Sequence, residues 1–79
     1  MTLLKRDKVN YRILITDDDD DCRYGLNEIF EPEGYTTYMA SCGREAVEIA
    51  KHNFLHLLIL DVHMPDFSGF ETFEFIKEE

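Results

Sequence analysis

The sequence predicts an α/β domain built on a parallel β-sheet, and three observations support this prediction. Segments suited to β-strands alternate three times with segments suited to α-helices. The third strand-like segment, residues 55–62, has apolar side chains at consecutive positions, which is typical of a strand covered on both faces of a parallel sheet. The first and third strand-like segments both end at aspartates, and sites in such sheets lie beyond the carboxyl ends of the strands. Crossover helices should therefore connect parallel strands.

The first repeat follows a polar leader. Residues 1–10 are charged and have no sustained period, so we expect an N-terminal extension there. Residues 11–16 (YRILIT) form a branched and apolar run that favours a buried strand. Over residues 20–31 apolar side chains recur at helical spacing, and aspartates occupy the end where the helix dipole favours them. Pro32 and Gly34 should end this helix.

The second and third repeats follow the same order. Residues 35–40 (YTTYMA) favour a strand, and residues 41–53 favour a helix that ends near its final His-Asn pair. After the third strand, Ser68 and Glu71 have the spacing of a capping box, in which each side chain bonds the other residue's backbone N–H at a helix start. The helix they begin should carry an apolar stripe made of Phe70, Phe73 and Ile76.

Composition restricts the classes of function. The 79 residues are enough for one small domain, and 44% hydrophobic residues argue against disorder. A net charge of -9 disfavours direct binding to nucleic acid or to anionic membranes. Two cysteines without ligand spacing indicate a reduced, cytoplasmic protein. The longest apolar stretch, residues 54–60, contains a histidine and is too short to span a bilayer, and the start lacks the pattern of a signal peptide.

Acidic residues at two strand ends indicate a cation site. Asp17 and Asp18 end the first strand and Asp61 ends the third, so the three carboxylates converge if these strands are neighbours. Two unit charges about 4 Å apart repel by roughly 4 kcal/mol at an effective dielectric of about 20, so the cluster requires a counter-ion. Hard oxygen ligands suit Mg²⁺. An aspartate beside such an ion can act as a nucleophile toward phosphorus.

Four stretches carry a family resemblance: RILITDDDDD, EGY, the helix start CGREAVEIA, and LLILDVHMPDFSGFE. Through them, residues 11–79 resemble part of the receiver domain of a two-component response regulator. The most specific stretch fits the family's DxxMPxxxG motif, matched here by Asp61, Met64, Pro65 and Gly69. The resemblance implies a flavodoxin-like, doubly wound sheet, of which this chain holds the N-terminal (βα)3 portion with strand order 2-1-3.

The resemblance also implies a role for each site residue. Asp61 would be the phosphoacceptor, taking a phosphoryl group from a sensor histidine kinase or a histidine phosphotransfer protein. Asp18 would bind Mg²⁺ directly and Asp17 mainly through water, while the backbone carbonyl of His63 would be the third protein ligand. Such a domain is a signalling phosphoacceptor rather than an enzyme.

The chain departs from the family by stopping at the third repeat. Receivers have five strand and helix repeats, so the family's Ser or Thr after the fourth strand and its Lys after the fifth cannot be assigned here. Their loss should weaken phosphoryl capture, whereas metal binding could survive it. The family strand order would also leave the third strand at a sheet edge with apolar faces partly uncovered. We therefore expect self-association that covers this edge.

Other interpretations remain open from the sequence. The main competitor is a receiver-like interaction or dimerisation module that is not phosphorylated. A calcium loop would use Asp17, Asp19, Asp21 and Glu28, but Cys22 stands where that loop requires glycine. A phosphatase of the Asp-x-Asp type lacks its second carboxylate. We expect structural roles for the remaining notable residues. Asp19 to Asp21 should form a solvated helix start, Cys22 should lie in the core, Cys42 should lie at a helix start, and Asp66 should lie in a turn. The histidines should not form a transition-metal site.

Overall fold

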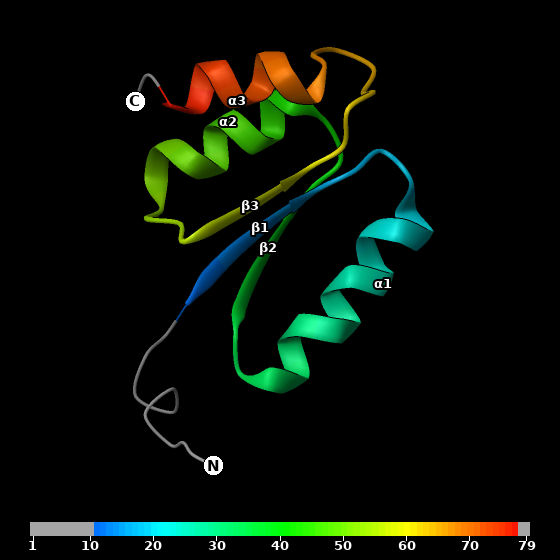
Figure 1. Cartoon of the computed structure of the whole chain (residues 1–79), viewed down its shortest axis with the longest axis vertical. Helices are drawn as coiled ribbons and strands as arrows, with labels where there is room; N and C mark the ends of the chain where they lie inside the picture. Colours follow the sequence, from blue (N-terminus) through cyan, green and yellow to red (C-terminus); the bar gives the residue numbers. More distant parts are fainter. Residues whose placement is uncertain (1–10, 78–79) are drawn as a thin grey trace.

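The computed structural model describes residues 11–77, so the predicted N-terminal extension, residues 1–10, lies outside the described residues. Three strands alternate with three α-helices (Figure 1). The elements are β1 (Arg12–Thr16), α1 (Asp20–Phe30), a short 3₁₀ helix η2 (Glu31–Glu33), β2 (Thr36–Ala40), α2 (Gly43–His52), β3 (Leu57–Leu60) and α3 (Gly69–Lys77). This order confirms the predicted alternation, and Gly34 closes η2 with a left-handed φ of 97°.

The three strands form one parallel sheet with the order β2-β1-β3, as predicted. Thr16 is in register with Ala40 of β2 on one side and with Leu60 of β3 on the other, so the carboxyl ends of the strands lie level. Helix α1 covers one face of the sheet, and α2 and α3 cover the other (Figure 1). Residues that follow β1 and β3 therefore meet at one edge of the sheet.

The core centres on β1. Ile13 is 3% exposed, and Leu14 and Ile15 are fully buried, because β1 has a strand on either side and helices over both faces. Ala40 and Ala46 contribute small buried side chains from β2 and α2. No described helix has the length and apolar content that crossing a bilayer requires.

Strand β3 lies at the edge of the sheet, and its apolar side chains are incompletely covered. Leu57 on the strand and Val62 just after it are each 45% exposed. An open groove of about 670 Å³ runs between β3 and α3, and its lining is mostly apolar. The prediction of a strand covered on both faces is therefore wrong for this part of the molecule, whereas the predicted open edge is confirmed for the described residues.

Helix α3 begins at the predicted capping box. The Ser68 hydroxyl accepts a hydrogen bond from the Glu71 N–H, and the Glu71 carboxylate accepts one from the Ser68 N–H, both at 3.0 Å. The predicted apolar stripe is only partly correct. Ile76 packs against the core, but Phe70 is 73% exposed and Phe73 is 45% exposed. Phe70 and Phe73 of α3 instead line the open groove beside β3.

Helix α1 corrects one prediction about its first turn. Cys22, expected in the core, is exposed, and the buried residue at that turn is Arg23. Helical periodicity did not resolve which of two adjacent residues faces inward, and the inward one is an arginine whose guanidinium bonds the backbone carbonyl of Asp17. Cys42 is the N-cap residue of α2, in line with the predicted helix start.

Candidate metal centre

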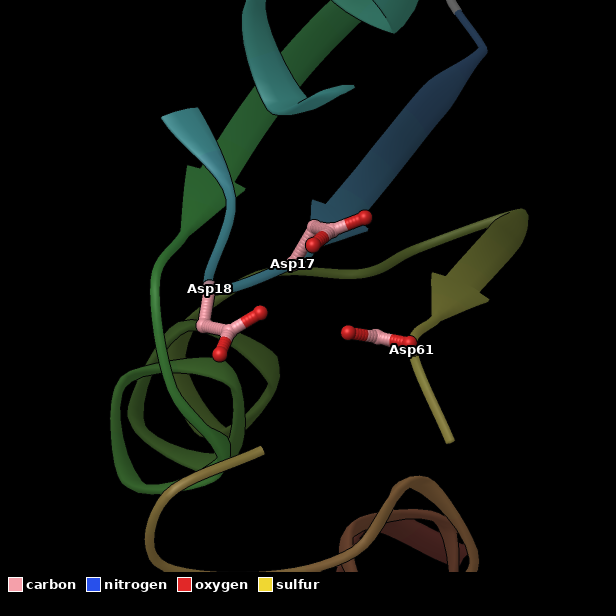
Figure 2. Close-up of side chains that lie close together, drawn as sticks. All are labelled: Asp17, Asp18 and Asp61. Carbon is pink, nitrogen blue, oxygen red and sulfur yellow. The ribbon is translucent and has the colours of Figure 1, made fainter. Parts of the chain in front are cut away.

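Three carboxylates come together at the carboxyl end of the sheet. Asp17 and Asp18 follow β1, and Asp61 follows β3. One carboxylate oxygen from each residue lies within 4.8 Å of the other two, and the side chains face a common space (Figure 2). Asp17 and Asp61 are partly buried, while Asp18 is exposed. The structure thus brings together the three carboxylates that the sequence predicted to converge.

Backbone pairing of the strands continues into the site. The Asp17 N–H donates to the carbonyl of Ala40 at 3.1 Å, and the Asp61 N–H donates to the carbonyl of Thr16 at 3.0 Å. These bonds extend the pairing of β1 with β2 and of β3 with β1 by one residue each. The positions of Asp17 and Asp61 therefore follow from the register of the sheet rather than from loop conformation.

The rest of the acidic run forms the start of α1. Asp19 is the N-cap residue, and its carboxylate accepts a hydrogen bond from the Asp21 N–H at 2.9 Å. Asp20 and Asp21 lie in the first helical turn, where the helix dipole favours negative charge. The Asp19 N–H also donates to the Asp17 carboxylate at 2.9 Å, which orients that side chain. The solvated helix start predicted for Asp19 to Asp21 agrees with these contacts.

Arg23 is the site residue that sequence reasoning missed. Its Nη1 donates to the backbone carbonyl of Asp17 at 2.7 Å, and its Nη2 pairs with the Asp20 carboxylate. Burial is the largest single influence and would lower the pKa of Arg23, but the hydrogen bonds and charges of Asp20 and Tyr24 together outweigh it, so the pKa is raised. The guanidinium therefore stays charged beside the acidic cluster. A positive residue two positions after an acidic run was the only available signal in the sequence.

Cys22 lies near the same cluster but does not contribute a reactive thiolate. The negative charges of Asp19 and then Asp17 raise the pKa of the Cys22 thiol, because a thiolate would repel them. A thiol that stays protonated is a poor nucleophile and a poor metal ligand.

Gly69 allows the loop after β3 to fold against Asp61. A Cβ atom on Gly69 would lie 2.2 Å from the carbonyl oxygen of Asp61, which is closer than any side chain tolerates. The Gly69 N–H also donates to the carbonyl of Val62 at 2.9 Å. The start of α3 is thereby fixed beside the end of β3, which is why glycine is needed at this place in the motif.

Asp66 ties the same loop to the start of α2. Its carboxylate accepts hydrogen bonds from the backbone N–H groups of Gly43 and Arg44, both at 2.9 Å, and of Phe67 at 2.7 Å. Desolvation opposes ionisation, but the N–H groups of Arg44, Gly43 and Phe67 outweigh it and lower the pKa of Asp66 to about 2. In addition to the predicted turn role, Asp66 caps the start of α2 from the loop that follows β3.

The histidines lie away from the three carboxylates or offer no side-chain ligand to them. His63 is exposed in the loop two residues after Asp61. The role of its backbone carbonyl as a metal ligand stays a prediction. His56 accepts a hydrogen bond from the Arg12 N–H at 3.0 Å, and His52 contacts Glu48. Within residues 11–77, the group of side chains placed to hold a metal consists of the three aspartates. Carboxylate oxygens are hard ligands that suit Mg²⁺ rather than a transition metal.

These features define a class: an α/β domain with a parallel sheet and an acidic site beyond the carboxyl ends of two adjacent strands. The family model of the response regulator receiver domain matches residues 13–79. The chain therefore belongs to the response regulator receiver domain family, and the resemblance noted in the sequence is confirmed.

Individual relatives agree with this assignment. The chain is 38% identical over 69 residues to sporulation initiation phosphotransferase F of Bacillus subtilis, an alignment that covers 87% of this chain and 56% of that protein. The chain thus spans about half the length of this relative. It resembles the response regulator TrrA of Thermotoga maritima, solved in complex with Mg²⁺ and BeF, with a TM-score of 0.80 and 37% identity over 86% of this chain and 59% of that one.

A third relative was solved with a partner protein. The receiver domain of Ssk1 from Saccharomyces cerevisiae, in a co-crystal with the histidine phosphotransfer signalling protein Ypd1, matches with a TM-score of 0.82 and 29% identity. The match covers 87% of this chain and 48% of that chain. Both structural matches place the three strands and three helices described here in the receiver fold.

Proposed function

We propose that this chain is a signalling phosphoacceptor that receives a phosphoryl group on Asp61 with the help of Mg²⁺. The observation that carries the proposal is the meeting of three carboxylates from two adjacent strands, with their oxygens within 4.8 Å of one another. Without a cation this arrangement is repulsive, so it favours a site that has evolved to hold one. TrrA, a relative solved with Mg²⁺ and BeF, supports the choice of metal.

Each residue has a distinct task in this proposal. Asp18 would hold the ion directly and Asp17 mainly through water, while Asp61 and the backbone carbonyl of His63 would complete the protein ligands. A carboxylate oxygen of Asp61 attacks the phosphorus of a phosphohistidine as the phosphorus–nitrogen bond breaks, and the electron pair of that bond stays on the imidazole. When bound, Mg²⁺ supplies positive charge that offsets the negative charge of the incoming phosphoryl group.

The proposed phosphoryl donor is a sensor histidine kinase or a histidine phosphotransfer protein. The co-crystal of Ypd1 with the Ssk1 receiver supports this class of partner. The net charge of -9 disfavours nucleic acid as a direct partner of this chain. Both cysteines are free thiols, which supports a reduced, cytoplasmic setting.

Phosphoryl capture tests the proposal. Incubation with Mg²⁺ and acetyl phosphate, followed by intact mass measurement, should show one added phosphoryl group on a fraction of the molecules. The Asp61→Asn variant should show none, and the Asp21→Asn variant, which loses an acid outside the three-carboxylate group, should be labelled like wild type. Equal labelling of wild type and Asp61→Asn would refute the assignment of Asp61.

A second candidate is an interaction module that associates with a second copy of itself and is not phosphorylated. The open edge of β3 and the adjoining groove favour it, because unpaired strand edges and apolar patches both promote association. The groove carries little charge on a strongly acidic chain, so it is the surface where two copies repel least. Pairing of two β3 edges would cover the exposed Leu57 and Phe70.

Sedimentation separates this candidate from a monomer. Wild type should sediment as a dimer at micromolar concentration, and Leu57→Lys should shift it toward the monomer by placing charge at the edge. Ile29→Lys is the matched control, because Ile29 is also exposed, at 61%, but lies on α1 over the other face. A wild-type chain that stays folded and monomeric at every concentration would refute the association.

A further inference from the structure

Arg23 is a buried cation in the most acidic part of the chain. Only 8% of the residue is exposed, although it follows five consecutive aspartates by two positions. Its guanidinium reaches back from the first turn of α1 and bonds the backbone carbonyl of Asp17 at 2.7 Å. The other arm of the guanidinium pairs with the Asp20 carboxylate. Because a buried charge is costly unless it is hydrogen-bonded, this geometry is strongly constrained.

The carbonyl that Arg23 holds belongs to a specific peptide group. The carbonyl of Asp17 is part of the peptide that joins Asp17 to Asp18, so its orientation sets the directions in which both carboxylates leave the backbone. The Asp17 N–H is held from the other side by the carbonyl of Ala40 at 3.1 Å. The segment between β1 and α1 is thus held by the sheet at one end and by Arg23 at the other.

We propose that Arg23 is a positioning residue for the metal site, which holds the Asp17–Asp18 peptide so that both carboxylates face Asp61. This inference rests on the proposed function, because it concerns the same Mg²⁺ site. Arginine suits the task because its planar guanidinium makes two directed hydrogen bonds, whereas lysine places a point charge on a flexible stem. Residues that orient metal ligands typically change metal affinity by about 10- to 100-fold when they are replaced.

A positioning role and a purely electrostatic role predict opposite changes in Mg²⁺ affinity when the charge of Arg23 is removed. A positive charge near the site repels Mg²⁺, so on electrostatic grounds alone its removal should tighten Mg²⁺ binding. If Arg23 instead orients the ligands, its removal should weaken binding despite the loss of repulsion. The direction of the change in affinity therefore identifies which effect dominates.

Calorimetric titration of the whole chain with Mg²⁺ measures that direction. We expect Arg23→Gln to weaken Mg²⁺ binding by about 10-fold. Arg23→Lys restores the charge but not the two-armed geometry, so it should bind more weakly than wild type and more tightly than Arg23→Gln. Arg44→Gln removes the same charge from an exposed position at the start of α2 and should leave binding unchanged or slightly tighter.

The outcomes separate this inference from the proposed function. Wild-type affinity or tighter binding in Arg23→Gln overturns the positioning role while the metal site stands. If Arg23→Gln does not fold, Arg23→Lys decides, and wild-type affinity in that variant overturns the role. Failure of the wild-type chain itself to bind Mg²⁺ overturns the proposed function instead.

Discussion

Strands β1 and β3 both end at site aspartates, but they differ sharply in how they are supported. The side chains of Ile13 to Thr16 on β1 are at most 3% exposed, and β1 has a neighbour on each side. Among residues 11–77, β3 pairs with β1 on one side only, and Leu57 at its start is 45% exposed. The site therefore joins a strongly supported half, which carries Asp17 and Asp18, to a weakly supported half, which carries Asp61.

This difference indicates which half of the site is disrupted more easily. Asp17 is held by sheet pairing through its N–H, and its carbonyl, in the peptide shared with Asp18, accepts a hydrogen bond from the buried Arg23. The position of Asp61 depends on the hydrogen bond from its N–H to the carbonyl of Thr16 and on the loop that Gly69 and Asp66 hold in place. Regions with few buried apolar contacts open at lower free energy than the core does. We therefore expect disturbances of β3 to affect the site before they affect the fold.

The largest expected effect is a difference in stability loss between equivalent substitutions on the two strands. Leu14→Ala removes a fully buried side chain from β1 and should lower the free energy of unfolding by roughly 2–5 kcal/mol. Leu57→Ala removes a half-exposed side chain from β3 and should cost about 1 kcal/mol or less. Urea denaturation of the two variants measures both losses. Equal losses would show that the two strands are equally supported.

A glycine pair tests the loop that supports Asp61. Gly69→Ala places a Cβ against the Asp61 carbonyl, so it should lower the free energy of unfolding by about 1–3 kcal/mol and weaken Mg²⁺ binding. Gly25→Ala is the control, because its Cβ position in α1 meets no described atom within 4 Å apart from the nearby backbone of the same helix, and it should raise stability by about 0.5–1 kcal/mol. Unchanged Mg²⁺ affinity in Gly69→Ala would contradict this role.

A smaller effect depends on pH. The folded pKa of Asp66, about 2, lies below its ordinary value of 3.8, so its ionised form contributes stability that is fully present above that value. This contribution is lost as the pH falls through 2. Asp66→Asn cannot ionise, so its deficit in stability relative to wild type should be constant from neutral pH to about 4 and shrink below it. A deficit that persists unchanged in acid would contradict the capping role.

Much of the fold could be predicted from the sequence because its signals are local. Alternating strand and helix patterns gave the order of elements, and the capping box at Ser68 and Glu71 gave the start of α3. The exposure of Phe70 and Phe73 could not be read from periodicity, since it depends on what lies beside α3 in space. Helical spacing cannot show whether an apolar stripe has a partner.

The candidate site also has a part that could be predicted from the sequence and a part that could not. The convergence of Asp17, Asp18 and Asp61 follows from their places after parallel strands that are neighbours, and the strand order that makes them neighbours came from the family resemblance. Arg23 was missed because one of its partners is a backbone carbonyl, which leaves no mark in the sequence, and the other, Asp20, is one of five adjacent aspartates. The link from Asp66 to the start of α2 was missed for the same reason.

Mg²⁺ titration of wild type against single aspartate variants tests most directly whether both strands build one metal site. Asp18→Asn and Asp61→Asn should each weaken binding by at least about 10-fold, although the two residues come from different strands. Asp21→Asn, which lies in the first turn of α1, should bind like wild type. Wild-type affinity in Asp61→Asn, together with a loss in Asp18→Asn, would show that β3 takes no part in the site.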